Sequence, residues 1–118
     1  MSDSTISTGN IYISQRAIAT IAYQSSLESY GVVGLAAKNF AQGIAHALVK
    51  DPLMGVEVRQ DENTISIDLY IIVEYGTRIK SVASSVAESV RYHVEKSTGL
   101  QVKEVNVHVR GLRISDLD

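Results

Sequence analysis

Three histidines, His46, His93 and His108, carry the side chains best suited to ligating a metal ion or acting as a general base. No two of them stand in a metal-binding pattern such as HExxH, where the ligands lie one helical turn apart. The chain has no cysteine, which excludes a thiolate metal site, a thiol nucleophile and a disulfide framework. We therefore expect no metal ion, no cofactor and no histidine-based catalysis.

The carboxylates offer no catalytic pair either. Asp68 and Glu74 fall on the same face of one alternating stretch, but at about 3.3 Å per residue they are too far apart to share a proton. Catalysis by paired carboxylates would need a second acid from another element. The sequence contains no GxSxG nucleophile elbow and no Walker-type phosphate loop. We expect the protein not to be an enzyme.

Composition limits the remaining classes. The chain has 118 residues, of which 45% are hydrophobic, and its formal net charge is −2 at pH 7. This length suits one domain, and the acidic balance argues against a dedicated nucleic-acid binder. The polar N-terminus does not resemble a signal peptide, and no apolar run is long enough to span a bilayer. We expect a cytoplasmic protein, with any membrane association supplied by a partner.

Hydrophobic periodicity in the first half predicts two helices and a strand. Residues 11–13 alternate and predict a short strand, and Ser14 suits the N-cap of a helix that ends before Gly31. The small apolar stretch 31–37 is interpreted as a tightly packed turn. Residues 39–49 place apolar side chains on one stripe and predict a second, short helix.

The second half predicts a hairpin, a long helix and a final strand. Residues 56–59 and 64–74 alternate with period two on either side of a polar turn at 60–63. Residues 79–94 then carry one apolar helical stripe, and valines alternate with polar residues over 105–109. Gly99 is expected to end the long helix in the left-handed conformation.

These elements predict a two-layer α+β domain. A mixed β-sheet of three to four strands would carry two main helices on one face, in the order strand, helix, (short helix), strand, strand, helix, strand. A helix between the last two strands favours a parallel crossover, and the order matches the split βαβ, ferredoxin-like pattern. The domain is expected to cover residues 9–114, between a disordered lead at 1–8 and a tail at 115–118.

Several short pieces of the chain carry a family resemblance through their order and spacing. They are GNIYI at 9–13, GVVG at 31–34, ISIDL at 65–69 with EYGT at 74–77, TGL at 98–100 and VNVHV at 105–109. Together they resemble the alkaline shock protein family of Gram-positive bacteria, also called envelope stress response proteins. The resemblance implies a small cytoplasmic protein without established catalysis, linked to cell-envelope stress. It also implies a homo-oligomer held near the membrane by a membrane-anchored partner.

One face of the predicted sheet is the candidate interaction site. If the helices cover one face, the other presents apolar side chains beside acids, and the final strand adds Asn106 and two basic side chains. A partly apolar, outward sheet face often marks an interaction site. The alternative is that a loop or the first strand covers this face. The expected interaction residues are Tyr70, Ile72, Asp68, Glu74, His108 and Arg110.

Two functions are consistent with these observations. The first is a non-catalytic protein of the cell-envelope and alkaline stress response that acts by self-association and protein–protein interaction. The alternative is a KH-like nucleic-acid-binding module, because the sequence at 31–34 is a GxxG and such a loop between two helices clamps an RNA backbone. Its central residues are two valines and the net charge is negative, so we expect the loop to be a packing turn and nucleic acid not to be a partner.

Overall fold

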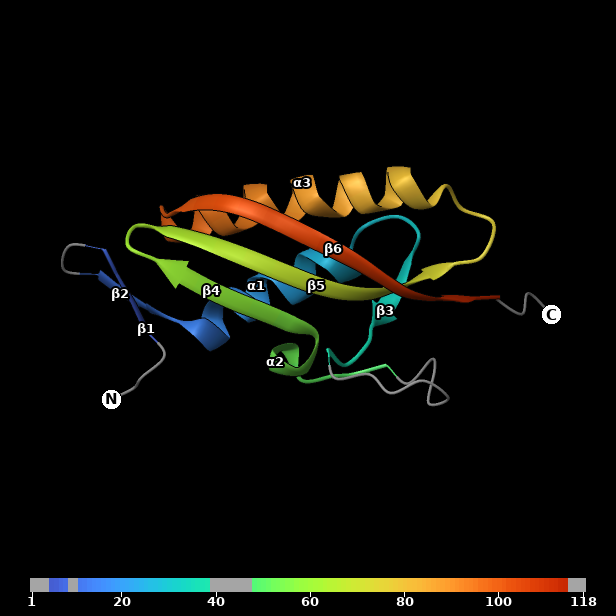
Figure 1. The fold of residues 1–118 in the computed structure, drawn as a ribbon, viewed down its shortest axis with the longest axis horizontal. Helices are drawn as coiled ribbons and strands as arrows, with labels where there is room; N and C mark the ends of the chain where they lie inside the picture. The colour runs from blue at the N-terminus through green and yellow to red at the C-terminus, as the bar shows by residue number, and fades with distance from the viewer. Residues whose placement is uncertain (1–4, 9–10, 39–47, 115–118) are drawn as a thin grey trace.

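The computed structural model describes residues 5–8, 11–38 and 48–114, and it has two layers (Figure 1). Two helices, α1 and α3, lie against one face of a four-stranded sheet. The α+β class, the mixed sheet and the two main helices on one face are confirmed. The elements in chain order are β1 Thr5–Thr8, β2 Ile11–Ser14, α1 Gln15–Leu27, β3 Val32–Leu35, α2 Pro52–Gly55, β4 Val56–Asp61, β5 Thr64–Glu74, α3 Ile79–Thr98 and β6 Gln101–Arg113.

Strand β5 is the centre of the sheet. Along one edge it pairs with β6 in parallel from end to end, which is the predicted crossover through α3. Along the other edge its first half pairs antiparallel with β4, and its second half pairs antiparallel with β3. The predicted β4–β5 hairpin is confirmed, with Glu62 at its turn in the left-handed region (φ 55°). Strand β5 therefore has a neighbour along nearly all of both edges.

The core lies between β5 and the two helices. Every second side chain of β5, from Ile65 to Val73, has no exposed surface. These aliphatic groups pack against a valine stripe of α3 and against Ile18 and its neighbours on α1. Full burial of one such side chain is worth about 1.5–3 kcal/mol, so this strand alone accounts for a large share of the stabilisation. The valines of the stripe are Val82, Val86, Val90 and Val94.

The ends of both long helices follow their sequence signals. The hydroxyl of Ser14 accepts a hydrogen bond from the Ala17 N–H at 3.0 Å, as expected for an N-cap. At the end of α3, Gly99 adopts φ 76°, and its N–H donates to the Glu95 carbonyl at 2.8 Å. Leu100 then packs back into the core.

Two stretches of the first half differ from the local structure predicted for them. The stretch 31–37 is not a turn, because Val32–Leu35 form β3, whose apolar residues complete the second half of the sheet beside β5. The lead that was expected to be disordered contains β1, in which three of the four residues are β-branched and therefore suit a strand. The helix predicted over 39–49 lies largely outside the described residues.

The ferredoxin-like pattern is wrong, although the class is right. That pattern needs the strand before α1 to enter the main sheet, whereas β2, among the strands of the described residues, pairs only with β1 in a separate two-stranded sheet. The strand that takes its place is β3, which follows α1. Between β3 and the hairpin, the carboxylate of Asp51 accepts the Leu53 N–H at 3.0 Å and caps the four-residue helix α2.

Gly31 is predicted to be the least replaceable of the three described glycines that have a positive φ. It has φ 89°, and a Cβ there would lie 2.6 Å from a methyl group of Val82, which is buried in the core. Gly99 has a similar φ of 76° but open space around it, so it is a matched control. We expect Gly99→Ala to cost about 1–2 kcal/mol of unfolding free energy and Gly31→Ala about 1–3 kcal/mol more. Urea denaturation measures both, and equal losses would contradict the close contact.

Candidate functional site

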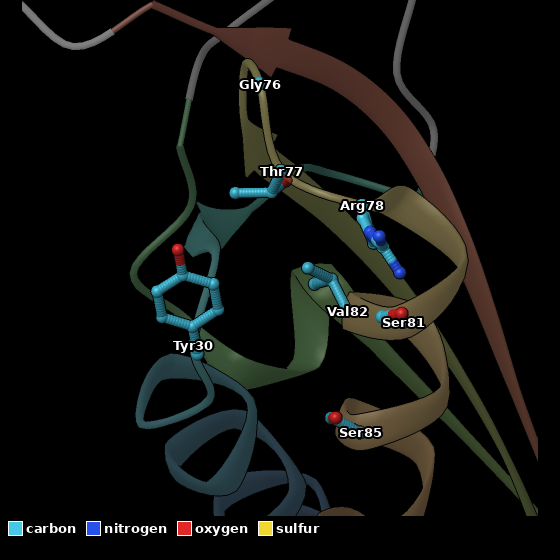
Figure 2. Close-up of a pocket in the computed structure, with 7 residues that line it drawn as sticks. All are labelled: Tyr30, Gly76, Thr77, Arg78, Ser81, Val82 and Ser85. Atoms are coloured by element: carbon cyan, nitrogen blue, oxygen red, sulfur yellow. The ribbon is translucent and has the colours of Figure 1, made fainter.

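A shallow cleft lies where the end of α1 meets the start of α3 (Figure 2). Its volume is about 340 Å³, and the exposed ring of Tyr30 forms one wall. None of its lining side chains is an acid or an imidazole, so it does not gather the groups that proton transfer would need. The lining residues are Tyr30, Gly76, Thr77, Arg78, Ser81, Val82 and Ser85.

The polar side chains gather instead on the open face of the sheet, the face turned away from α1 and α3. Strand alternation sends the residues between the core positions of β5 to this face, and pairing in register brings their neighbours beside them. Asp68 lies between Glu57 of β4 and Asn106 of β6, and Tyr70 lies beside His108 of β6. The open face is therefore built from the β4–β5 hairpin and from β6, which follows α3 in the sequence.

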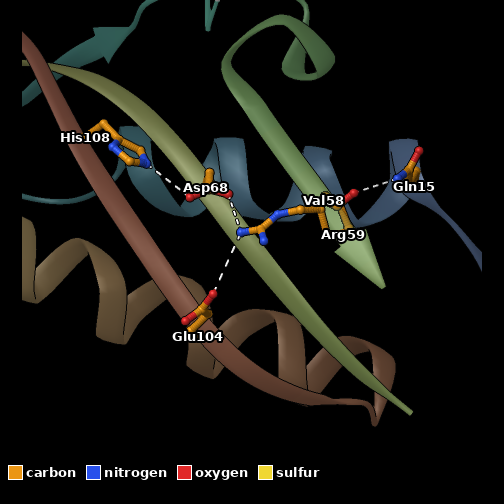
Figure 3. Close-up of polar contacts among 6 residues, drawn as sticks. All are labelled: Gln15, Val58, Arg59, Asp68, Glu104 and His108. Carbon is orange, nitrogen blue, oxygen red and sulfur yellow. Dashed lines mark hydrogen bonds and ion pairs between the residues drawn. The ribbon is translucent and has the colours of Figure 1, made fainter. Parts of the chain in front are cut away.

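Asp68 is the centre of the polar contacts (Figure 3). The residue is only 8% exposed, yet its carboxylate bonds two neighbours on opposite sides. One oxygen accepts a hydrogen bond from the guanidinium of Arg59, and the other lies 3.1 Å from Nε2 of His108. The same guanidinium lies 3.9 Å from a carboxylate oxygen of Glu104 on β6. One buried carboxylate thus orients a cation from β4 and an imidazole from β6.

The contacts continue through aromatic rings. The rings of His108 and Tyr70 stack with centroids 4.7 Å apart and planes 12° from parallel. The guanidinium carbon of Arg110 lies 5.0 Å from the centroid of the Tyr70 ring, which is the distance of a cation–π contact. We call this continuous series of contacts the polar ladder. It consists of Glu104, Arg59, Asp68, His108, Tyr70 and Arg110.

The environment of Asp68 favours its charged form. Burial raises the pKa of the Asp68 carboxyl, but hydrogen bonds from His108, Asn106 and Arg59, together with the positive charge of Arg59, lower the pKa by more. The net pKa lies below the ordinary value, so this carboxylate is ionised at neutral pH. It can therefore hold its two neighbours by charge-assisted hydrogen bonds.

The phenol of Tyr70 is shifted in the opposite direction. Burial raises its pKa, and the negative charges of Asp68 and Glu57 raise it further, while Arg110 and Arg59 lower it by less. The phenol is therefore neutral at physiological pH. Its ring offers a neutral π-face to Arg110 on the surface of the sheet.

The structure brings together four of the six expected interaction residues, Asp68, Tyr70, His108 and Arg110. The expectation that Ile72 points outward is wrong, because this side chain has no exposed surface. Its pairing partner on β3 is Gly34, and the Leu48 side chain packs over that glycine. Part of the open face is therefore covered, as the alternative interpretation allowed.

Glu74 does not join the polar ladder. It lies at the far end of β5, where it pairs in register with Arg113 of β6. Arg59 and Glu104 are ladder members that the sequence did not single out for this face. The hairpin register contained the signal for Arg59, since it lies opposite Ser66 and therefore diagonal to Asp68 on the same face.

The remaining candidates have structural explanations. The Nδ1 atom of His93 lies 2.8 Å from the Ser89 carbonyl oxygen one turn earlier in α3, and His46 lies outside the described residues. Within 5–8, 11–38 and 48–114, no three His, Asp or Glu side chains could hold a metal ion together.

The loop that a KH-like module requires does not form at its expected place, because Val32 to Gly34 belong to β3 and pair with β5. The RNA-binding interpretation therefore loses its GxxG loop.

Fold and site together define a small α+β domain whose polar groups are arranged across an open sheet face. The model of the alkaline shock protein 23 family, described as having a cell envelope-related function, matches residues 3–114. The chain therefore belongs to this family, which confirms the resemblance carried by the sequence. No helix in the described part of the chain is both long and apolar enough to cross a membrane.

The relatives described here cover 92% and 72% of the chain. The protein YloU of Bacillus subtilis (strain 168) is 43% identical over 110 residues, which cover 92% of both chains. A stress response regulator gls24 homologue of Streptococcus pyogenes serotype M3 (strain MGAS315) is 30% identical, over 72% of this chain and 54% of that protein. Among solved structures, the zinc form of the MamM CTD D249N variant aligns with a TM-score of 0.51 at 15% identity, covering 86% of this chain and 89% of the other, and this likeness concerns the fold alone.

The charge of Asp68 is predicted to stabilise the fold in a pH-dependent way. Because its pKa is lowered in the folded state, its contribution is present above about pH 3.9, the unfolded value, and is lost as pH falls through the folded pKa. Its two partners are half-exposed, so we expect Asp68→Asn to lower the unfolding free energy by about 1–2 kcal/mol at pH 7. The loss should shrink as the pH falls below about 4.

Urea denaturation of both proteins at a series of pH values measures this effect. Asp61→Asn is the control, since Asp61 is an exposed acid at the end of β4. A loss that is the same at pH 3 and pH 7 would show that Asp68 acts by shape rather than by charge.

Proposed function

We propose that this protein acts in the envelope stress response without catalysis, by self-association and by binding another protein through the polar ladder. Family membership supports a role related to the cell envelope, and the description of the streptococcal relative as a stress response regulator supports the response. The proposal places the protein in the cytoplasm, beside the membrane, through a membrane-anchored partner.

The observation that carries this proposal is the arrangement around Asp68. The carboxylate is buried, whereas the side chains it holds, Arg59 and His108, are 49% and 42% exposed. Their orientation is set before any partner arrives, so binding does not have to order them. Arginine and aromatic residues are also the types enriched at the centres of protein interfaces. The polar ladder therefore suits recognition of a partner surface that carries acidic and planar groups.

The same arrangement is poorly suited to turnover. Each ionised group of the polar ladder is bonded to an opposite charge or an aromatic ring, and the ladder runs over a sheet surface rather than into a pocket. A general base needs access to a substrate proton within hydrogen-bond reach. The contacts of Asp68 are used to hold its neighbours, which supports a binding role.

Partner capture tests whether the protein binds another protein through the polar ladder. We expect tagged wild-type protein, crosslinked in cells of its own species, to retain a protein with a membrane-spanning segment. Arg59→Glu places an acid beside Asp68 and Glu104 and should abolish this capture. Lys96→Glu is the matched charge reversal on the exposed side of α3 and should leave it intact. Thermal unfolding confirms that both variants are folded, and equal capture by folded Arg59→Glu would contradict the role of the ladder.

Light scattering after size exclusion tests self-association. We expect a species heavier than the 12.8 kDa chain, with a fraction that grows with protein concentration. A single 12.8 kDa species over the whole accessible concentration range would contradict it.

A further inference from the structure

We propose that two copies of this chain join edge to edge through β6, antiparallel and centred on Val107, to form one continuous sheet. The inference deepens the proposed function, because it rests on self-association and assigns the surface that performs it. It places this contact on the edge of the sheet, where it shares only Glu104 and Arg110 with the polar ladder, and leaves the other four ladder residues for the other partner.

The starting observation is the length of an unpaired edge. β6 has 13 residues and, among the strands of the described residues, pairs only with β5 (Figure 1). Side chains of α3 satisfy its first outward backbone groups: the Glu95 carboxylate accepts from the Val102 N–H at 3.0 Å, and Arg91 donates to the Val102 carbonyl. Beyond that residue the described part of the chain supplies no strand along this edge. An open edge of this length is a template for another strand.

The register with β5 shows which backbone groups are available. The Tyr70 carbonyl accepts the Ala36 N–H on the β3 side at 2.8 Å, so Leu69 and Ile71 turn their backbone groups towards β6. In a parallel ladder a residue bonds the two neighbours of its register partner, so the partner itself points away. The partners on β6 are Val107 and Val109, and Val105 follows the same alternation. These three valines therefore present their N–H and C=O groups at the outer edge.

Bulges limit the regular edge to one short segment. The register with β5 shifts twice, which leaves Lys103 and Arg110 as extra residues on β6. Bulges and basic side chains are the devices that restrict pairing at sheet edges, and here they stand at both ends of 104–109. Pairing is thereby confined to a segment that contains all three outward valines.

Only one antiparallel register uses this segment fully. With the two-fold axis through Val107, that residue lies opposite its own copy, and Val105 lies opposite Val109 of the second copy at both ends. Three pairs that each exchange two bonds give about six N–H···O bonds. A shift of the axis by one residue in either direction leaves two such pairs.

The side chains are complementary in the same register. Glu104 of each copy lies opposite Arg110 of the other, so two opposite charges meet at both ends of the contact, and Asn106 lies opposite His108. On the helix side, valines meet valines. With the axis at Asn106 instead, Arg110 would lie opposite Val102. Hydrogen bonding and charge therefore select the same register, which identifies the occupant of the edge as a second copy.

The symmetry of this contact also determines which assembly forms. An antiparallel pair related by a two-fold axis perpendicular to the sheet keeps both open faces on the same side. The contact is isologous and uses up the β6 edge of both copies, so it closes as a dimer. Two polar ladders then face one direction, and a membrane carrying several partner molecules can engage both. Such bivalent binding raises the apparent affinity without any new contact.

Cysteine crosslinking tests the register directly, since the chain has no cysteine of its own. In the proposed dimer the two Cα atoms of residue 107 lie about 5.5 Å apart, within disulfide range. The two Cα atoms of residue 105, or of residue 109, lie about 13 Å apart along the strand. After mild oxidation we expect Val107→Cys to shift from 12.8 kDa to twice that mass on a non-reducing gel.

The matched controls are Val105→Cys and Val109→Cys, which should each remain unlinked alone and should crosslink when mixed. Charge reversal is a second measurement: Glu104→Arg and Arg110→Glu should each weaken the dimer in light scattering, and the double reversal should restore it. A dimer that forms while Val107→Cys crosslinks no better than the controls overturns this inference and leaves self-association standing. A strict monomer at every concentration overturns both.

Discussion

The rest of the structure depends on one constraint: β5 must be hydrogen-bonded to neighbouring strands along both edges while one of its faces is buried against the helices. Its odd-numbered residues from Ile65 to Val73 are all fully buried, so any shift of register by one residue would turn five aliphatic side chains to the open face. That cost fixes β6 on one edge and β4 with β3 on the other. The helices then have a single apolar surface on which to pack their own stripes.

The same constraint places the functional groups. Because the core positions of β5 are fixed, Asp68 and Tyr70 are fixed on the opposite face, and their neighbours on β4 and β6 follow from the strand pairing. A carboxylate that is only 8% exposed would be costly without partners. Arg59 and His108 compensate it, and both are held in place by doing so. Stability and a preorganised surface therefore arise from the same contacts.

How much the sequence predicts depends on the range of the interaction. The hairpin, the stripe of α3 and the alternation of β6 are local patterns, and all three were predicted. β3 was missed because the short stretch Val32–Leu35, which itself contains Gly34, is recognisable as a strand only from its pairing with the end of β5, some forty residues later. Ile72 was misplaced for the same reason, since alternation assigns it to the open face but cannot show Leu48 packing over the adjacent Gly34. Asp68, Tyr70, His108 and Arg110 were predicted to share a face, whereas the ion pair with Arg59 required the strand register.

Arg110 connects the two surfaces of the sheet that matter for binding. It is the extra residue of a bulge in β6, and a bulge redirects a side chain relative to the regular strand. Its guanidinium lies over Tyr70, one step from His108 and two steps from the buried carboxylate. Arg110, which stands at the end of the edge segment 104–109, is thus also the last member of the polar ladder. A group that contacts this guanidinium at the edge would therefore also lie beside the aromatic stack of the face, because Arg110 belongs to both surfaces.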